Sequence, residues 1–260
     1  MPHVARICLY PIKSLDGLAV RQAKVLQSGA LEYDRQFAIF DEQGKYVNAK
    51  RYAKIHLLRS KFDLENNIVS LKIQCQNIVE SFNLESEKPH LESWLSKFFG
   101  FTIKLKENQT TGFPDDTVSP GPTIVSTATL KEVASWYSDL TENDIRHRMR
   151  TTIEIDGVPA FWEDKLFSES GNFINFKIGN LHFVGVNPCQ RCIVPTRNAV
   201  TAEISSGFQE IFINKRRETL PTWAKKSRFN HYYKLAVNTK LADNEIANQL
   251  IKIGDAIDIF

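Results

Sequence analysis

The sequence has little cysteine, no long apolar run and almost no excess of charge of either sign. Its only cysteines are Cys8, Cys75, Cys189 and Cys192, too few and too unevenly spaced for a disulfide framework in a chain of 260 residues. No apolar stretch approaches the roughly 18 residues of a membrane span, and the first six residues lack the pattern of a secretory signal. The net charge of +3 is too small to indicate a nucleic acid or a membrane surface as a partner. We therefore expect a cytoplasmic protein with free thiols, no nucleic-acid partner and no membrane association.

Several catalytic signatures are missing as well. The chain contains no Gly-X-Ser-X-Gly motif, no Gly-rich phosphate-binding loop and no His-Glu-X-X-His pair, the signatures of serine hydrolases, P-loop enzymes and zinc proteases. Two nearby cysteines and a few dispersed cations remain as candidates for chemistry.

The apolar pattern predicts a strand-rich fold. In the first part of the chain, strand-like segments alternate with turn residues, at residues 3–10, 19–26, 35–40, 55–64 and 68–74. Later strands are expected at 123–125, 151–155, 232–237 and 256–260, with a hairpin at 173–186. Since strands and helices do not alternate as βαβ units require, a doubly wound parallel sheet is not expected.

Helical periodicity is confined to a few segments. Leu91, Trp94, Leu95 and Phe98 fall on one face of a helix closed by Gly100, and further helices are expected near 127–137 and 208–217. The segment 108–122 is rich in Pro and Gly and is a candidate linker. We predict an α+β, strand-rich protein with a β-barrel-like domain at 1–110 and a second β-barrel with peripheral helices at 111–260.

The most informative stretch is Asn187-Pro188-Cys189-Gln190-Arg191-Cys192-Ile193-Val194-Pro195-Thr196. A Cys-X-X-Cys pair can be half of a zinc site, a redox dithiol, one thiolate ligand of a softer metal centre, or two inert cysteines in a turn. No second Cys-X-X-Cys or His pair supports a closed zinc site. Pro195 interrupts any helix that a thioredoxin-like motif would need. The interpretation that one cysteine is a thiolate ligand of molybdenum or a similar metal stays open.

Such a centre would need an anchored organic cofactor, and a phosphate is held by Lys, Arg, hydroxyls and backbone N–H groups. Lys13 and Ser14 lie in the first turn, and Arg35 and Arg150 each lie at the start of a predicted strand. Residues 146–150 contain three arginines that would share one face if this stretch were extended. Solvated strand edges are the alternative explanation for these cations.

Together, these motifs resemble the MOSC family, named for the C-terminal domain of molybdenum cofactor sulfurase. The resemblance is to its two-part form with an N-terminal β-barrel, which includes the mitochondrial amidoxime-reducing component and its bacterial relatives. It extends over nearly the whole chain and rests on five segments. They are Tyr10-Pro11-Ile12-Lys13-Ser14 followed by Gly17, Asp34-Arg35-Gln36-Phe37-Ala38-Ile39, Val47-Asn48-Ala49-Lys50, the cysteine motif Cys189-Gln190-Arg191-Cys192-Ile193-Val194-Pro195-Thr196, and Lys252-Ile253-Gly254-Asp255.

The resemblance implies a molybdenum pyranopterin cofactor (Mo-molybdopterin) between the two domains. Cys192 would be the metal ligand and the catalytic residue, with Cys189 as a structural neighbour. The residues implied in cofactor binding are Lys13, Ser14, Arg35, Ser119, Gly121, Arg150, Thr152 and Cys192. The chain departs from the family at two of these places, because Thr152 stands where the family usually has Asn, and the loop at 119–121 offers mostly backbone donors. A family-level label of pyridoxal phosphate binding comes with the same resemblance.

The function implied is a molybdenum-dependent oxidoreductase that reduces N-hydroxylated or other N-oxygenated small molecules, in the manner of an amidoxime or hydroxylamine reductase. The ferredoxin-like module of some bacterial members is not seen before Phe260, so electrons are expected from a separate ferredoxin-, flavodoxin- or cytochrome-type protein. The alternative is a molybdenum-cofactor carrier or a sulfur-transfer protein that does not turn over a substrate.

Overall fold

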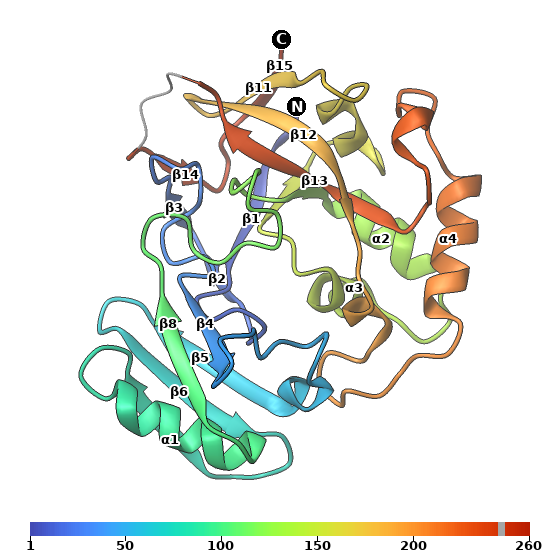
Figure 1. Ribbon diagram of the computed structural model, residues 1–260. Helices are drawn as coiled ribbons and strands as arrows, with labels where there is room; N and C mark the ends of the chain where they lie inside the picture. The colour runs from blue at the N-terminus through green and yellow to red at the C-terminus, as the bar shows by residue number, and fades with distance from the viewer. Residues whose placement is uncertain (244–247) are drawn as a thin grey trace.

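A computed structural model of the chain describes residues 1–243 and 248–260 (Figure 1). Its largest sheet has eight strands in the order β15-β11-β12-β13-β9-β10-β1-β2. In chain order these are β1 (His3–Leu9), β2 (Leu18–Val20), β9 (Ile124–Ser126), β10 (Ile153–Asp156), β11 (Ile174–Ile178), β12 (Leu181–Gln190), β13 (Lys234–Leu241) and β15 (Ile257–Ile259). Neighbouring strands are antiparallel except β9 and β10, which run parallel.

Three smaller sheets complete the strand content of the part of the chain described. They pair β14 (Leu250–Lys252) with β3 (Gln22–Lys24), β4 (Phe37–Asp41) with β8 (Ile103–Glu107), and β5 (Leu58–Asp63) with β6 (Ile68–Ile73) and β7 (Val79–Asn83). The helices are α1 (Lys88–Phe99), α2 (Thr127–Ser135), α3 (Glu142–Met149) and α4 (Phe208–Glu218), with short 3-10 turns η1 (Ala53–Leu57), η2 (Trp162–Leu166), η3 (Val194–Thr196) and η4 (Lys226–Arg228).

Three apolar clusters hold these elements together. One packs α1 against β4–β8, and Figure 1 shows this group in the lower half of the molecule. A second fills the large sheet, and a third joins α2, α3 and α4 in the other half. Val194, two residues after Cys192, packs against the first cluster, so the cysteine motif lies where the two halves meet.

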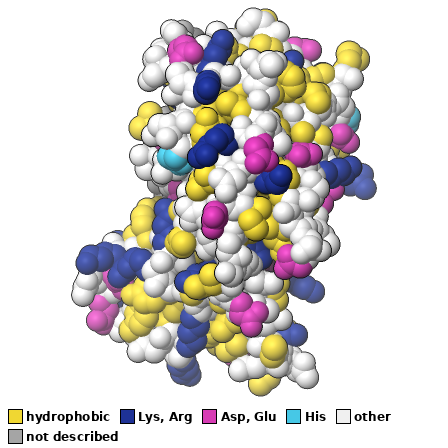
Figure 2. Space-filling view, turned by 90° about the vertical axis from the view of Figure 1, so that its right-hand side faces the viewer, with side chains coloured by type: hydrophobic (Ala, Val, Ile, Leu, Met, Phe, Trp, Pro, Cys, Tyr) yellow, Lys and Arg dark blue, Asp and Glu magenta, His cyan; other side chains and the backbone are white. Residues whose placement is uncertain are grey.

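The expected strand-rich α+β class is confirmed. The predicted hairpin at 173–186 is β11 and β12, and α1 ends at Gly100 in the left-handed conformation that glycine favours. The α2 helix begins at Ser126, whose side chain accepts a hydrogen bond from the Thr129 N–H. The exposed face in Figure 2 shows cationic and anionic side chains interspersed, as the small net charge indicates.

Two local predictions are wrong, and a third stretch takes a conformation that was not considered. Residues 19–26 form two short strands in different sheets rather than one strand. Residues 55–57 belong to a 3-10 turn that precedes β5. The arginine-rich stretch is not extended but forms the end of α3, because Thr141 and Asp144 make a capping box that begins this helix.

The predicted division at residue 110 stays a prediction. The strands β1 and β2, from the first range, pair in one sheet with β10, from the second. Within residues 1–243 and 248–260, none of the helices is long and apolar enough to cross a membrane. The cytoplasmic location stays a prediction.

Candidate functional site

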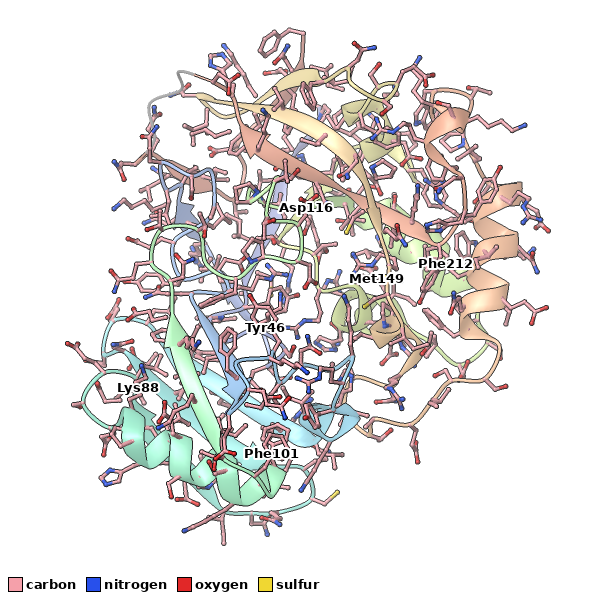
Figure 3. All side chains as sticks on the ribbon, viewed as in Figure 1. Tyr46, Lys88, Phe101, Asp116, Met149 and Phe212 are labelled. Carbon is pink, nitrogen blue, oxygen red and sulfur yellow. The ribbon has the colours of Figure 1, made fainter. Side chains whose placement is uncertain are left out.

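A cavity of about 890 Å³ lies between the two halves of the molecule. All the residues predicted to bind the cofactor line it: Lys13, Ser14, Arg35, Ser119, Gly121, Arg150, Thr152 and Cys192. Asp116 and Met149 also line the cavity and lie in the middle of the molecule in Figure 3, far from Lys88 at the start of α1. The fold therefore gathers residues from distant parts of the sequence at one place, while their roles stay predictions.

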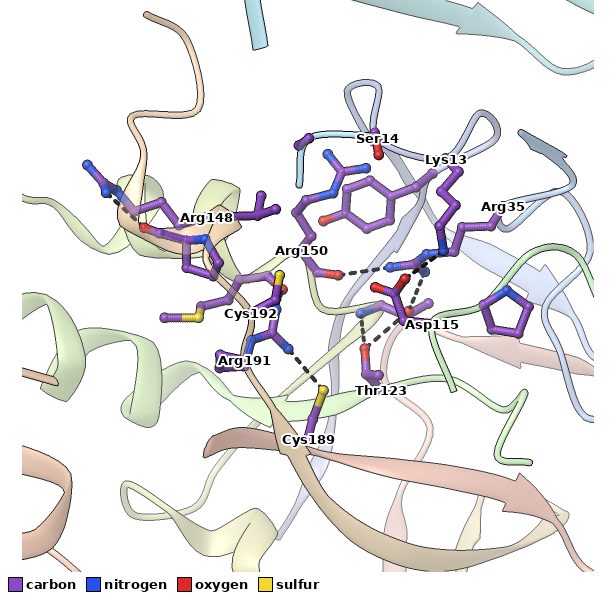
Figure 4. A pocket seen from close by; sticks show the side chains of 18 of the residues that line it. Lys13, Ser14, Arg35, Asp115, Thr123, Arg148, Arg150, Cys189, Arg191 and Cys192 are labelled. Carbon is purple, nitrogen blue, oxygen red and sulfur yellow. Dashed lines mark hydrogen bonds and ion pairs between the residues drawn. The ribbon is translucent and has the colours of Figure 1, made fainter. Parts of the chain in front are cut away.

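One wall of the cavity is built around Arg35. Its guanidinium donates to the Asp34 carboxylate, to Thr152 Oγ1 at 3.2 Å and to the Arg150 carbonyl oxygen at 3.1 Å (Figure 4). Burial would lower the pKa of Arg35, but nearby negative charge, above all the Asp34 carboxylate, outweighs it and raises that pKa. Arg35 is therefore a fixed cation with only part of its five N–H donors committed to the protein.

Arg150 is held differently. It is the left-handed residue that ends α3, with φ of 53°, and its guanidinium lies over the Tyr10 ring, 4.2 Å from the centroid. The Arg35 guanidinium lies 4.7 Å from the same centroid. Among the described residues, no side chain or carbonyl accepts a hydrogen bond from the Arg150 guanidinium, and burial lowers its pKa. Arg150 is thus positioned by stacking and by its backbone, with its donors free for a ligand.

Backbone strain is concentrated at this wall. Ser14, Arg35 and Arg150 have φ values of 74°, 48° and 53°, a region that side chains other than glycine seldom adopt. Each such residue costs on the order of 1 kcal/mol. Because three residues of one cavity share this conformation, the strain is consistent with a site whose geometry matters more than its local stability.

Lys13 enters the cavity beside a carboxylate. Its ammonium donates to the Phe113 carbonyl oxygen at 2.8 Å and to Asp115 Oδ1 at 2.7 Å. Burial lowers the pKa of Lys13, and Asp115 partly offsets this. Desolvation would raise the pKa of Asp115, but Lys13 reverses this and lowers it to about 2. One of the three ammonium donors remains for a ligand.

The two cysteines of the motif have different surroundings. Cys189 is in β12, packs against the apolar cluster of α2, α3 and α4, and accepts a hydrogen bond from Arg191 Nη1 at 3.0 Å. Cys192 follows the end of β12 and points toward the part of the cavity where Arg150 lies (Figure 4). Both thiols are free and half-buried. This asymmetry agrees with the expectation that Cys192 is available to a metal and that Cys189 is structural.

Arg148 fixes the turn that follows the motif. It is buried in α3, and its guanidinium donates to the Pro195 carbonyl oxygen at 2.9 Å and to Ser205 Oγ at 2.8 Å. The two arginines of α3 therefore have different partners. Arg148 holds the turn after Cys192, whereas Arg146 forms ion pairs with Glu142 and Glu154. This role was not predicted, because the sequence was considered only for the case in which the stretch is extended.

Polar atoms without partners mark another part of the cavity wall. Ser119 is 4% exposed, and its Oγ has no hydrogen-bond partner among residues 1–243 and 248–260; the same holds for Asn187 Oδ1. The Ser119 N–H bonds to Asp116, which also accepts from Asn238, the residue opposite Asn187 in the sheet. Buried polar groups normally have partners, so a ligand with polar edges would fit here.

Gly121 contributes in a different way from the one expected. Its N–H already donates to the Thr239 carbonyl oxygen at 2.9 Å, so it is not a free donor. A Cβ on Gly121 would lie 2.6 Å from that same oxygen. The glycine therefore lets the loop approach β13 closely, which places Ser119 in the cavity wall.

The cavity has an excess of positive charge. In the part of the chain that the structure describes, seven of its cations have no carboxylate within 4.0 Å: Lys50, Arg148, Arg150, Arg191, Arg197, Arg228 and Lys234. Such a surplus favours an anionic ligand. A soft thiol, free cationic donors and unpartnered polar atoms together fit a metal-bearing cofactor with a polar ring system and a phosphate.

Several other acidic and metal-ligating side chains of the described residues lie outside the cavity or have protein partners. The described residues contain no group of three or more His, Cys, Asp or Glu side chains that could hold a metal, which leaves the zinc alternative without further ligands. Trp162, Glu163 and Asp164 are buried in η2 and do not line the cavity. Asp115 and Asp116 bind Lys13 and Asn238 rather than forming a cation site. Pyridoxal phosphate binding stays a prediction.

Comparison with known proteins gives one family and several relatives. The chain matches the family described as the MOSC N-terminal beta barrel domain over residues 1–144. Molybdenum cofactor sulfurase 2 of Culex quinquefasciatus is 32% identical over 92 residues, 35% of this chain and 12% of that protein. Molybdenum cofactor sulfurase of Bos taurus is 23% identical over 265 residues, 83% of this chain and 29% of that protein. Molybdenum cofactor sulfurase of Drosophila mojavensis is 23% identical over 291 residues, which are 98% of this chain and 34% of that protein. The chain spans about a third or less of the length of these relatives.

Proposed function

This chain belongs to the MOSC N-terminal beta barrel domain family, and we propose that it binds the molybdenum pyranopterin cofactor in its central cavity and acts as a reductase of N-hydroxylated small molecules. The single observation that supports this most is the meeting of Cys192 with Lys13, Arg35 and Arg150 in one cavity with surplus positive charge. The names of the relatives also point to chemistry of the molybdenum cofactor.

In this proposal each residue has a definite task. Cys192 supplies a thiolate to the metal, and the free N–H groups of Arg150, Arg35 and Lys13 hold the phosphate. Ser119 and Asn187 take the polar edges of the pterin, because their buried side-chain oxygens lack partners in the described chain. Arg148 keeps Cys192 in place through the Pro195 carbonyl. The cofactor, when bound, supplies a molybdenum centre able to deliver two electrons to an N–O bond.

The overall reaction is R–NHOH + 2e⁻ + 2H⁺ → R–NH₂ + H₂O. The N–O bond breaks, nitrogen is reduced and the oxygen leaves as water, so two electrons and two protons enter. We propose that the electrons come from a ferredoxin-, flavodoxin- or cytochrome-type protein in the cytoplasm. Tyr10 is buried and its burial raises its pKa, so the phenol beside the two arginines keeps its proton and adds no negative charge to compete with an anionic ligand.

The test is purification of the full chain from a molybdenum-replete host, with measurement of bound molybdenum and pterin. Reduction of N-hydroxylaminopurine is then measured with an artificial electron donor. We expect stoichiometric metal and turnover in the wild type, and loss of both in Cys192→Ser. The matched control is Cys75→Ser, which removes an exposed thiol outside the cavity. A wild type free of molybdenum and pterin would refute the proposal.

A second function is favoured by one observation. The Arg191 guanidinium donates to Cys189 Sγ, and a cationic donor stabilises a sulfur anion, as a sulfur-transfer protein would need. In that case the chain would carry the cofactor, or sulfane sulfur on Cys189, without reducing a substrate. Bound molybdenum with no turnover, together with cyanide-releasable sulfur that disappears in Cys189→Ser, would support this function over the reductase.

A further inference from the structure

A group of residues at the side of the cavity is not used by the cofactor proposal. It contains His56 of η1 and Arg197, which directly follows η3. These residues come from the two halves of the molecule, and Arg59 joins them by donating to the carbonyl oxygens of His56 at 2.7 Å and Ala199 at 3.1 Å. The two sides of this corner are therefore fixed relative to each other.

His56 is an uncharged acceptor in this corner. The residue is 8% exposed, and its Nε2 has no hydrogen-bond partner among the described residues. A neutral imidazole keeps a lone pair on one ring nitrogen, which can accept a hydrogen bond or take up a proton. Burial, and then the positive charges of Arg150, Arg59 and Arg197, lower the pKa of His56 to about 4.

Arg197 has hydrogen-bonding capacity left over. Its Nη1 donates to the Ala202 carbonyl oxygen at 3.2 Å, and no carboxylate of the described chain lies within 4.0 Å of it. Asp16, which also lines the cavity, is engaged by Arg59 at 3.4 Å and accepts a hydrogen bond from the Ser60 N–H at 2.9 Å. The corner thus offers unpaired positive charge and an imidazole able to take up a proton.

We propose that Arg197 and His56 form an oxyanion subsite that binds a carboxylate or phosphate group of the substrate. The proposal rests on the proposed reductase function and names its substrate class: N-hydroxylated compounds that carry an anionic group. Lys13, Ser14, Arg35 and Arg150 remain with the phosphate of the cofactor. An anion beside Arg197 offsets the cations that keep His56 neutral, so anion binding is accompanied by proton uptake at His56.

The sign of the pH dependence follows from this linkage. Because the anion-bound form holds the proton more tightly than the free form, affinity for the anion rises as pH falls, by at most tenfold per pH unit. The groups that act on His56 are Arg59 from β5, Arg150 from the end of α3 and Arg197 from the loop after η3. Because a guanidinium is not deprotonated in proteins, the imidazole is the group that titrates.

The first measurement uses sulfate as the probe, since its charge is constant between about pH 5 and pH 8. The imidazole resonances of the full, cofactor-free chain are titrated by NMR with and without sulfate, and His56 is assigned through His56→Gln. We expect sulfate to raise the pKa of His56 and Arg197→Gln to weaken sulfate binding about tenfold at low pH. His90→Gln, on the exposed side of α1, is the control and should leave the binding unchanged.

The second measurement separates the substrate from the cofactor as the source of the anion. In cofactor-loaded chain, we expect sulfate still to raise the pKa of His56. We also expect Arg197→Gln to raise the KM for 4-carboxybenzamidoxime about tenfold, with that for benzamidoxime unchanged. A His56 titration that is the same with and without sulfate would overturn the proposal, and so would a sulfate effect that vanishes once the cofactor is bound. The titration of cofactor-free chain stands even if the chain proves to carry no molybdenum, so the two proposals fail separately.

Discussion

Replacing Glu163 by Gln should remove a large part of the pH dependence of stability. Glu163 is 1% exposed in η2, where its Oε2 accepts from the Ser126 N–H at 3.2 Å and from Thr129 Oγ1 at 3.0 Å. Its Oε1 has no partner in the described part of the chain. These contacts hold the start of α2. This helix packs on α3, which carries arginines that line the cavity.

The magnitude comes from the proton affinity of this carboxyl. Burial, and then the neighbouring Asp164, raise the pKa of Glu163 from 4.5 to about 7. A carboxyl with a raised folded-state pKa contributes stability that is fully present below the unfolded pKa and is lost as pH rises through the folded pKa. At about 1.4 kcal/mol per pH unit, the whole effect is about 3 kcal/mol, of which about 2 kcal/mol falls between about pH 5 and pH 8.

Urea unfolding at a series of pH values measures this effect. Glu163→Gln keeps an oxygen for Ser126 and Thr129 but cannot ionise, so its free energy of unfolding should fall about 2 kcal/mol less than that of the wild type between about pH 5 and pH 8. Glu210→Gln, exposed on α4, should follow the wild-type curve. Parallel curves for the wild type and Glu163→Gln would refute the reasoning, because Glu163 would then ionise as easily in the folded as in the unfolded chain.

Three further changes test how the cavity is built. Arg148→Gln removes a buried cation and its hydrogen bonds to Pro195 and Ser205, so the free energy of unfolding in urea should fall by about 3 kcal/mol. The thiols in the loop that Arg148 holds should also be alkylated faster. An unchanged alkylation rate would contradict the positioning role of Arg148. Gly121→Ala places a Cβ 2.6 Å from the Thr239 carbonyl oxygen and should lower the free energy of unfolding by about 1–3 kcal/mol, a loss that thermal denaturation would detect or exclude. Asp115→Asn removes the charge that supports protonation of Lys13, so the pKa of Lys13 should fall further and acylation of its amine near pH 8 should become faster, which mass spectrometry of the labelled peptide can check.

Much of the fold was predictable because local patterns agreed with the tertiary structure. The apolar stripe from Leu91 to Phe98 and the terminating Gly100 define α1. The β11–β12 hairpin follows from alternation around a Gly-Asn turn. The α3 helix was missed even though its signal was present, since Thr141 followed by Asp144 is a capping box. The stretch was judged by the possible alignment of its arginines instead.

The site could be predicted only in part. The cysteine motif and the turn at Lys13 have local signatures, and the structure brings them to one cavity. The partners that set their properties cannot be seen locally, because Asp115 is 102 residues from Lys13 in the sequence. His56 carried no signal, since a single histidine in an apolar segment resembles a core residue, and its surroundings appear only when η1 meets the loop after η3.

The most direct test of the central proposal is X-ray absorption at the molybdenum edge, comparing the wild type with Cys192→Ser and Cys189→Ser. If Cys192 is the metal ligand, Cys192→Ser should show one sulfur neighbour of molybdenum fewer than the wild type, or no bound metal at all, and Cys189→Ser should keep the wild-type number. An unchanged sulfur count in Cys192→Ser, or an equal loss in both variants, would contradict the assignment of Cys192 as the molybdenum ligand.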